Sequence, residues 1–195
     1  MKALLRCFFV FLALSILGSI PVSAAPDATS NKLLPSFKQY QNAKHQLQIS
    51  YPATWSMKEA YMGTVVVFSA PPDSSDDQFA ENINIVTEDL SRFPGMTIEQ
   101  YVEHGKITLS KIATDFILIS NQPITIANIK ARVLTFTATQ GIYKLQFRQT
   151  SLIVNNMAYV ITFTAEEDKF SQYESIAKSI TNSFTIQTSA SVPSI

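Results

Sequence analysis

The acidic residues of this sequence are spaced closely enough that several could act together on one ligand. Four of them fall in the loop-like stretch PPDSSDDQFAE, namely Asp73, Asp76, Asp77 and Glu81. Two more, Glu88 and Asp89, end the next stretch, ENINIVTED. Calcium takes about six to eight oxygen ligands, and carboxylates on a flexible loop can supply several of them. The four loop acids are therefore the candidate metal ligands of the chain.

The same acids also have a simpler interpretation. Their spacing does not match an EF-hand loop, and no glycine supplies the sharp turn of that loop. Proline, aspartate and serine are ordinary loop residues, so a solvated loop explains the composition equally well. Within ENINIVTED, Ile83 and Ile85 alternate with Asn82 and Asn84 at the period of a strand. We expect ENINIVTED to be a sheet strand whose acids lie at its ends and do not converge, and the preceding loop to remain a metal or partner-contact candidate.

Other patterns of catalysis and metal binding are missing or have a structural explanation. His45 and His104 are the only histidines, and a zinc site needs about four ligands, so we expect both to be surface residues. No Gly-x-Ser-x-Gly motif marks a hydrolase nucleophile. The acids 166–168 could do acid–base work, but their place before a helix favours an interaction with the helix dipole. We expect no enzymatic activity, no catalytic residue and no cofactor.

The first 24 residues have the pattern of a secretory signal peptide. Lys2 and Arg6 precede an apolar run, and small residues lead to Ala24, where we expect cleavage. Retention as a membrane anchor is the alternative, although the run is short for a span of about 20 residues. The only cysteine, Cys7, lies inside this segment, so the mature chain has no thiol for disulfides or metal binding. We expect export to the periplasm, or to the thylakoid lumen if the host is photosynthetic.

Composition limits the partners of the mature chain. Without Lys2 and Arg6, 13 of the 15 basic residues remain against 15 acidic ones, and no basic stripe is present. This balance argues against nucleic acid and anionic membrane surfaces as main partners. The four glycines after Ala24 form no phosphate-binding loop, which excludes the usual nucleotide-binding folds.

Strand patterns dominate the remaining chain. Residues 47–51 alternate apolar and polar side chains, and 65–68 form an apolar run typical of a strand buried on both faces. The stretches 131–139, 142–154 and 157–164 are rich in β-branched and aromatic residues, which predicts three successive antiparallel strands. Asn155-Asn156 suits a tight hairpin because asparagine tolerates positive φ, and Gln140-Gly141 is expected to turn the preceding hairpin.

Two amphipathic stretches predict helices that cover the sheet. Thr97 and Gln100 have the spacing of a capping box, and an apolar stripe follows at helical spacing: Ile98, Tyr101, Val102, Leu109 and Ile112. A second stripe comprises Phe170, Tyr173, Ile176, Ala177, Ile180 and Phe184. Each stripe must be buried against another element, which predicts an α+β fold with helices packed on an antiparallel sheet. We expect one domain over 37–186, with a disordered leader at 25–36 and a flexible tail at 187–195.

Several segments in a fixed order resemble a known family. The segments are YPATW at 51–55, ENINIVTEDLS, the helix start TIEQYVE, the stretch ITIANIKARVLTFTA, the stretch AYVITFTAEEDKF and the end Ser183-Phe184. Together they are similar to the bacterial and cyanobacterial PsbP-like group, relatives of the extrinsic PsbP protein of photosystem II. The resemblance extends over about 37–186. The cyanobacterial form is typically a lipoprotein, and the cysteine which that anchor requires is absent here.

The resemblance implies an antiparallel sheet flanked by helices on both sides, in an α/β/α sandwich. It also implies an exported, non-enzymatic accessory role, such as binding or assisting the assembly of a membrane complex through a protein partner. None of the family's binding residues transfers to a position of this chain. The alternative function is a carrier of an apolar small molecule in a pocket between sheet and helices.

Overall fold

The structure is a computed structural model that describes residues 36–187. The expected signal peptide, nearly all of the leader and the tail beyond Gln187 lie outside these residues. The two ends of the described chain are hydrogen-bonded to the domain. The amide of Ala53 donates to the carbonyl oxygen of Ser36, and the amide of Gln187 donates to that of Gln46, each at 2.8 Å.

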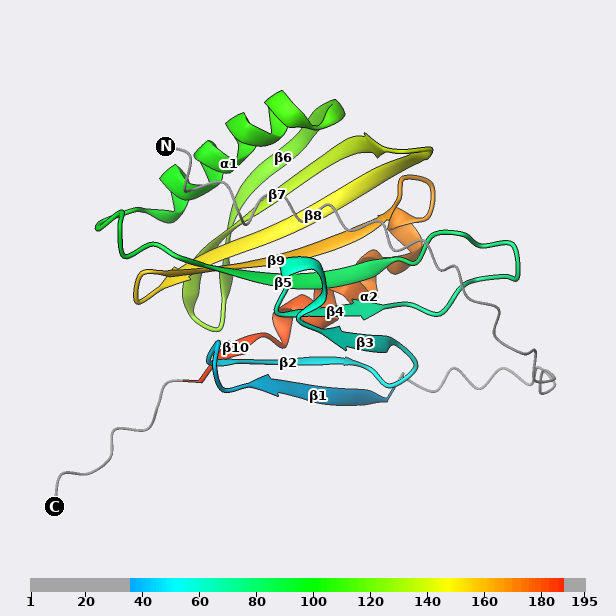
Figure 1. Cartoon of the computed structure of the whole chain (residues 1–195), viewed down its shortest axis with the longest axis horizontal. Helices are drawn as coiled ribbons and strands as arrows, with labels where there is room; N and C mark the ends of the chain where they lie inside the picture. Colours follow the sequence, from blue (N-terminus) through cyan, green and yellow to red (C-terminus); the bar gives the residue numbers. More distant parts are fainter. Residues whose placement is uncertain (1–35, 188–195) are drawn as a thin grey trace, which may run out of the picture.

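A seven-stranded antiparallel sheet forms the centre of the molecule, with the order β3-β4-β5-β9-β8-β7-β6 (Figure 1). Its strands are β3 (Ser56–Glu59), β4 (Val66–Ser69), β5 (Asn82–Asp89), β6 (Thr114–Ile126), β7 (Ile129–Gln140), β8 (Tyr143–Val154) and β9 (Met157–Glu166). The stretch ENINIVTED therefore forms a strand, as predicted, and it lies inside the sheet between β4 and β9. All four residues of β4 are buried, as the apolar run at 65–68 indicates.

A smaller sheet, two α-helices and the short 3-10 helix η2 (Tyr61–Gly63) complete the fold of the described residues. The smaller sheet has the order β1-β2-β10, formed by β1 (Phe37–Asn42), β2 (Leu47–Pro52) and β10 (Thr185–Ile186). The α-helices are α1 (Ile98–Ile112) and α2 (Phe170–Asn182). Strands β1, β3, β6 and β10 were not predicted from the sequence.

Two hydrophobic cores lie on opposite faces of the large sheet. Alternate residues of β9 show this: Val160 packs into a core with α1, whereas Ile161 and Phe163 pack into a core with α2 and the small sheet. Because successive side chains of a strand point to opposite faces, the two helices must cover different faces. The α+β sandwich with helices on both sides is thus confirmed: α1 lies over β6–β8 (Figure 1), and α2 packs against β9 and β2.

One of the two predicted hairpin turns lies where it was predicted, and the other is shifted by one residue. Asn155 and Asn156 join β8 to β9 with φ of 50° and 59°, as their tolerance of positive φ predicts. At the other hairpin, β7 continues through Gln140, and the turn is Gly141-Ile142. Gly141 has a φ of 60°, so the glycine still provides the left-handed residue of that turn.

Helix α1 begins with the predicted capping box. The Gln100 amide donates to the Thr97 hydroxyl oxygen at 3.2 Å, and the Thr97 amide donates to the Gln100 side-chain oxygen at 3.0 Å. Four residues of the predicted apolar stripe are buried. The prediction for Ile112 is wrong, because this side chain is 44 % exposed at the last turn of the helix.

Candidate functional site

The loop between β4 and β5 brings three of its acids together. Oxygen atoms of Asp73, Asp77 and Glu81 lie within 4.8 Å of one another, and we call these three residues the acidic cluster. Glu81 thus joins the loop acids that were predicted with it as metal candidates, and it does not meet Glu88 or Asp89 at the other end of ENINIVTED. The loop folds back on itself, since the Ala70 amide donates to the Glu81 carbonyl oxygen at 2.8 Å. This contact places Glu81 beside the first half of the loop.

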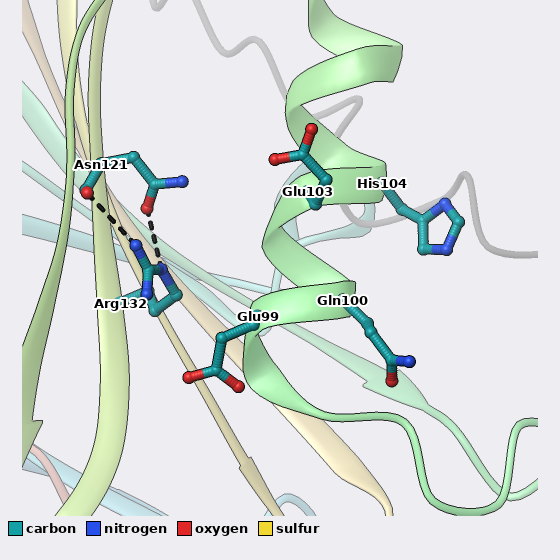
Figure 2. A pocket seen from close by; sticks show the side chains of 6 residues that line it. All are labelled: Glu99, Gln100, Glu103, His104, Asn121 and Arg132. Atoms are coloured by element: carbon teal, nitrogen blue, oxygen red, sulfur yellow. Dashed lines mark hydrogen bonds between the residues drawn. The ribbon is translucent and has the colours of Figure 1, made fainter.

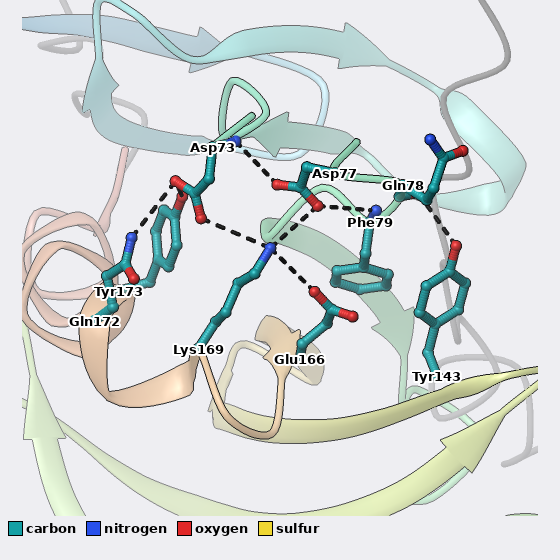
Figure 3. A network of polar contacts seen from close by, with 9 residues as sticks. All are labelled: Asp73, Asp77, Gln78, Phe79, Tyr143, Glu166, Lys169, Gln172 and Tyr173. Carbon is teal, nitrogen blue, oxygen red and sulfur yellow. Dashed lines mark hydrogen bonds and ion pairs between the residues drawn. The ribbon is translucent and has the colours of Figure 1, made fainter. Parts of the chain in front are cut away.

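Aromatic packing holds the second half of this loop against the sheet. The Phe79 side chain is buried and packs on the Tyr143 ring, with 5.2 Å between ring centroids. The Tyr143 hydroxyl also donates to the Gln78 carbonyl oxygen at 3.3 Å (Figure 3). The acidic cluster is therefore attached to strand β8 by one apolar and one polar contact.

Lys169 is the basic side chain at the acidic cluster. Its ammonium lies 3.1 Å from Asp77 Oδ1, 3.7 Å from Asp73 Oδ2 and 3.1 Å from Glu166 Oε2 (Figure 3). Burial alone would lower the pKa of Lys169, but its contacts with Asp77 and Glu166 outweigh burial and raise the pKa above the usual value. Lys169 is the residue just before α2, so it connects the loop to that helix.

The two aspartates of the cluster are held by several donors. Asp77 accepts hydrogen bonds from the amides of Asp73 at 2.9 Å and Phe79 at 3.2 Å. Burial would raise the pKa of Asp77, but these bonds and Lys169 lower it below the usual value. Asp73 accepts a hydrogen bond from the Tyr173 hydroxyl of α2 at 2.6 Å. Burial, and then this bond, raise the pKa of Tyr173.

Glu81 differs from both aspartates because no other described residue donates a hydrogen bond to its carboxylate. The residue is fully buried, and neither Oε1 nor Oε2 meets a donor on another described residue. Burial raises the pKa of Glu81 because it disfavours the charged form, and its own backbone amide and the charge of Lys169 lower the pKa by less. A buried carboxyl group without a partner destabilises a fold unless it takes up a proton or meets a cation.

A separate pocket of about 440 Å³ lies between α1 and strands β6 and β7. Its lining is polar and charged: Glu99, Gln100, Glu103, His104, Asn121 and Arg132. Arg132 donates to the side-chain oxygen of Asn121 at 2.9 Å and to its carbonyl oxygen at 3.2 Å. In Figure 2, His104 points away from this pair. No acid–base pair is therefore formed here by the residues that line the pocket.

An exposed apolar surface lies at the β6 edge of the large sheet. β6 ends the strand order and pairs with β7 alone. Three consecutive side chains of β6, Ile117, Leu118 and Ile119, are 41–63 % exposed. Ile107 and Ile112 of the preceding helix are also exposed. We call these five residues the β6 edge surface.

The comparison with protein families identifies the group to which the sequence belongs. The family model described as PsbP-like protein matches residues 24–186, which is most of the chain. The chain belongs to the PsbP-like family. This result confirms the resemblance derived from the order of sequence segments. Among curated proteins, no sequence matches the chain.

Solved structures share the fold of this PsbP-like chain at low sequence identity. Cyanobacterial PsbP (CyanoP) of Synechocystis sp. PCC 6803 is 15 % identical with a TM-score of 0.58, and the match covers 82 % of this chain and 98 % of CyanoP. PA94 of Pseudomonas aeruginosa, a protein of unknown function, is 16 % identical with a TM-score of 0.57, and the match covers 78 % of this chain and 99 % of PA94. LpqN of Mycobacterium tuberculosis, involved in cell envelope biogenesis, is 13 % identical with a TM-score of 0.54. The match covers 81 % of this chain and 88 % of LpqN.

Asp76, Glu88 and Asp89 of the PsbP-like chain lie apart from the cluster, whereas Glu166 shares Lys169 with it. Asp76 is exposed and is not part of the cluster. Glu88 and Asp89 lie at the far end of β5, where Glu88 accepts a hydrogen bond from the Tyr101 hydroxyl at 3.0 Å. Among the acids 166–168, Glu166 ends β9 and pairs with Lys169. Glu167 and Asp168 directly precede Lys169 at the start of α2, as predicted, and their contact with the helix dipole stays a prediction.

The two histidines of the PsbP-like chain have different environments. His104 is exposed, as expected. His45 is partly exposed, so it lies at the surface as expected, and its Nδ1 lies 2.9 Å from the Thr87 hydroxyl of β5. Burial, and then Lys44, lower the pKa of His45. No helix of the described residues is long and apolar enough to cross a membrane.

Sequence reasoning missed Lys169 and Tyr173 as partners of the acidic cluster. Tyr173 was assigned to the apolar stripe of α2, and its ring does pack at 6.4 Å from that of Trp55. Its hydroxyl nevertheless reaches Asp73. The only local indication of an ion pair was the position of Lys169, which follows three acids and precedes a predicted helix. Nothing in the sequence pairs this lysine with the loop between β4 and β5, which lies far away in the chain.

Proposed function

We propose that this PsbP-like chain is an exported, non-enzymatic accessory protein that binds a membrane-associated protein partner through the β6 edge surface. The observation that carries the proposal is the run Ile117, Leu118 and Ile119, exposed at a strand that ends the sheet. A run of exposed apolar side chains at the end of a sheet marks a candidate interaction surface, because apolar area in contact with water is unfavourable. Scattered single apolar residues would need no such explanation.

Two further observations support the location of this binding. The sequence pattern at residues 1–24 is that of a signal peptide, and the family match begins at residue 24. LpqN, a protein of similar fold, is involved in cell envelope biogenesis. A role at the envelope of a bacterium, or in the thylakoid lumen of a photosynthetic host, is consistent with both.

Features of β6 itself indicate how the partner is contacted. Irregularities in the register with β7 interrupt the first half of β6, and Pro123 lies in the second half. Bulges and prolines at sheet edges limit unspecific pairing of strands. We therefore assign the contact to the apolar side chains of the surface, which meet a complementary apolar patch of the partner, rather than to an added strand.

Site-specific crosslinking tests this surface directly. A photo-reactive amino acid in place of Ile119 should capture a defined membrane protein in the native host, identified by mass spectrometry. The matched control is Ile142, which is 88 % exposed at the β7–β8 turn and lies outside the surface. The same probe at position 142 should crosslink at least about tenfold less of the membrane partner, because only a probe inside the interface is in contact with it.

Charge substitution supplies the second part of the test. With the probe kept at position 119, Ile117→Lys should lose the crosslinked partner, whereas Ile142→Lys should retain it. Equal melting temperatures of the variants would show that the fold is intact. Equal capture from positions 119 and 142, or equal binding to protein-free lipid vesicles and native membranes, would contradict the proposal.

Carriage of an apolar small molecule is the alternative function. A carrier requires a pocket with a mainly apolar lining. The pocket between α1 and the sheet is lined by charged and amide side chains (Figure 2). Carbon atoms of these side chains provide much of the lining surface, but each side chain ends in a polar or charged group that an apolar ligand would leave without a partner, so we advance no carrier function.

A further inference from the structure

The buried carboxylate of Glu81 requires a partner that the described residues do not provide. Its side chain is inaccessible to solvent, and both of its oxygens lack a hydrogen bond to any other described residue. A charged carboxylate in this state is strongly unfavourable, so either a proton or a cation must neutralise it. Glu81 is also within reach of two other carboxylates, because it belongs to the acidic cluster. A cation can therefore be shared by all three groups.

The spacing of the acidic cluster fits one shared cation. Calcium binds oxygens at about 2.3–2.6 Å, so two ligands on opposite sides of one ion lie about 4.6–5.2 Å apart. The cluster oxygens are within 4.8 Å of one another, so three ligands can be placed around one ion with small side-chain rotations. Asp77 is already oriented by two backbone amides, and Asp73 by the Tyr173 hydroxyl.

The charge of the surroundings also favours a cation. Four carboxylates, the acidic cluster and Glu166, surround a single Lys169. The lysine forms ion pairs with Asp73, Asp77 and Glu166, but none with Glu81 among the described residues. Its side chain is 24 % exposed, so the ammonium can turn toward solvent and keep its contact with Glu166. Lys169 therefore occupies the cluster in competition with any other cation.

We propose that Asp73, Asp77 and Glu81 bind an oxygen-coordinated divalent cation, calcium in the first instance, in competition with Lys169. All three protein ligands are carboxylates, which suit hard cations and not zinc or copper. Calcium accepts irregular geometry and completes its shell with water, whereas magnesium demands a near-ideal octahedron. Only three protein ligands and a competing lysine predict an affinity like that of extracellular calcium modules, about 0.1–1 mM. The inference is independent of the β6 edge surface.

Calorimetric titration of the chelator-treated protein with calcium chloride tests the site. We expect a saturable heat and a rise in melting temperature at about 1–10 mM calcium, because a ligand that binds only the folded state stabilises it. Sodium chloride at matched ionic strength should give neither. A melting shift of the same size with sodium chloride would identify charge screening and overturn the proposal.

Three substitutions assign the binding to the cluster. Glu81→Gln keeps the shape of the side chain, removes its charge and should weaken calcium binding at least about tenfold. Asp76→Asn removes an equal charge from the same loop outside the cluster and should leave binding unchanged. Lys169→Met removes the competing ammonium and should strengthen binding several-fold, so the test stands even if Glu81→Gln fails to fold.

The contradicting results are equally specific. Absence of heat and of a melting shift in both the unmodified protein and Lys169→Met would exclude a calcium site. Equal weakening by Glu81→Gln and Asp76→Asn would show that the loop attracts calcium only through its total charge. Weaker binding in Lys169→Met would show that the lysine supports the cluster instead of competing, and would also overturn the proposal.

Discussion

Individual residues at the β4–β5 loop show how burial and partners set the state of a carboxyl group. Asp77 and Glu81 carry the same chemical group on one loop, yet their pKa values move in opposite directions. Backbone amides and Lys169 stabilise the charge of Asp77, whereas burial without a hydrogen bond from another residue disfavours the charge of Glu81. Their contributions to stability must therefore depend on pH with opposite signs.

Substitution of Glu81 by glutamine should stabilise the calcium-free protein at neutral pH. Burial raises the pKa of Glu81 in the folded state. The contribution of Glu81 to the free energy of unfolding is therefore fully present below the ordinary glutamate pKa, and it is lost as the pH rises through the pKa of the folded state. Glu81→Gln removes this loss, so we expect its free energy of unfolding at pH 7 to be higher by about 1–2 kcal/mol. Urea unfolding between pH 4 and 8, at about unit steps, measures the difference.

At the acid end of this pH range, the free energies of unfolding of the unmodified protein and of Glu81→Gln should become equal, because Glu81 is then protonated and uncharged. Asp77 is present in both proteins but repels the charge of Glu81, so part of the difference at neutral pH is the relief of that repulsion. A variant less stable than the unmodified protein at neutral pH, with calcium chelated, would show that Glu81 has a stabilising partner such as a bound water.

Among the elements, α1 and β6 illustrate which features can be predicted from local sequence. The start of α1 follows from a capping box whose two partners are three residues apart, and both bonds are present. Strand β6 lacks alternation and contains Pro123, which argues against a strand inside a sheet. It is an edge strand, where the missing amide of a proline is tolerated.

Removal of the cap should weaken α1 and with it the whole domain. Thr97→Ala deletes the hydroxyl oxygen that accepts from the Gln100 amide, and we expect a loss of about 1 kcal/mol in the free energy of unfolding. Thr97→Ser should retain most of the stability because serine keeps the acceptor. Chemical denaturation followed by circular dichroism measures both.

Ser110→Ala is the control within the same helix. Its hydroxyl donates to the Ile107 carbonyl oxygen inside the helix. This bond does not satisfy an unpaired backbone amide, unlike the bond at the helix start. A similar loss in Ser110→Ala and Thr97→Ala would show that the capping box contributes nothing beyond helix propensity.

The whole molecule has two cores that share the strands of one sheet. The three C-terminal strands and the helix faces could be predicted because their patterns repeat within about a dozen residues. The convergence of Glu81 with Asp73, Asp77 and Lys169 could not, because it depends on the closure of a loop and on a helix that begins far along the chain. Pairing across such distances is a property of the assembled sheet, and no local pattern encodes it.

Cavities on either face should therefore unfold the same cooperative unit. Phe163 packs against Phe170 on the α2 side, and Phe136 stacks on Phe147 on the α1 side. Substitution of either Phe163 or Phe136 by alanine should lower the free energy of unfolding by about 3–5 kcal/mol. The single tryptophan, Trp55, lies in the α2-side core and reports on that core by fluorescence.

The informative variant is Phe136→Ala, whose cavity is in the other core. Its midpoints from Trp55 fluorescence and from circular dichroism should coincide, because β9 contributes side chains to both cores. Separate midpoints would mean that the α1 side unfolds on its own.

The strand order has a consequence for the sequence of events during folding. Strands β6 to β9 are consecutive neighbours joined by tight turns, so their contacts are local and can form rapidly. β5 can pair with β4 early, but its other edge pairs with β9, in a register that joins Asn82 to Thr164. A chain synthesised from its N-terminus therefore carries an open β5 edge until β9 has emerged. Until then, the buried strand ENINIVTED is a segment that a chaperone or export factor can shield.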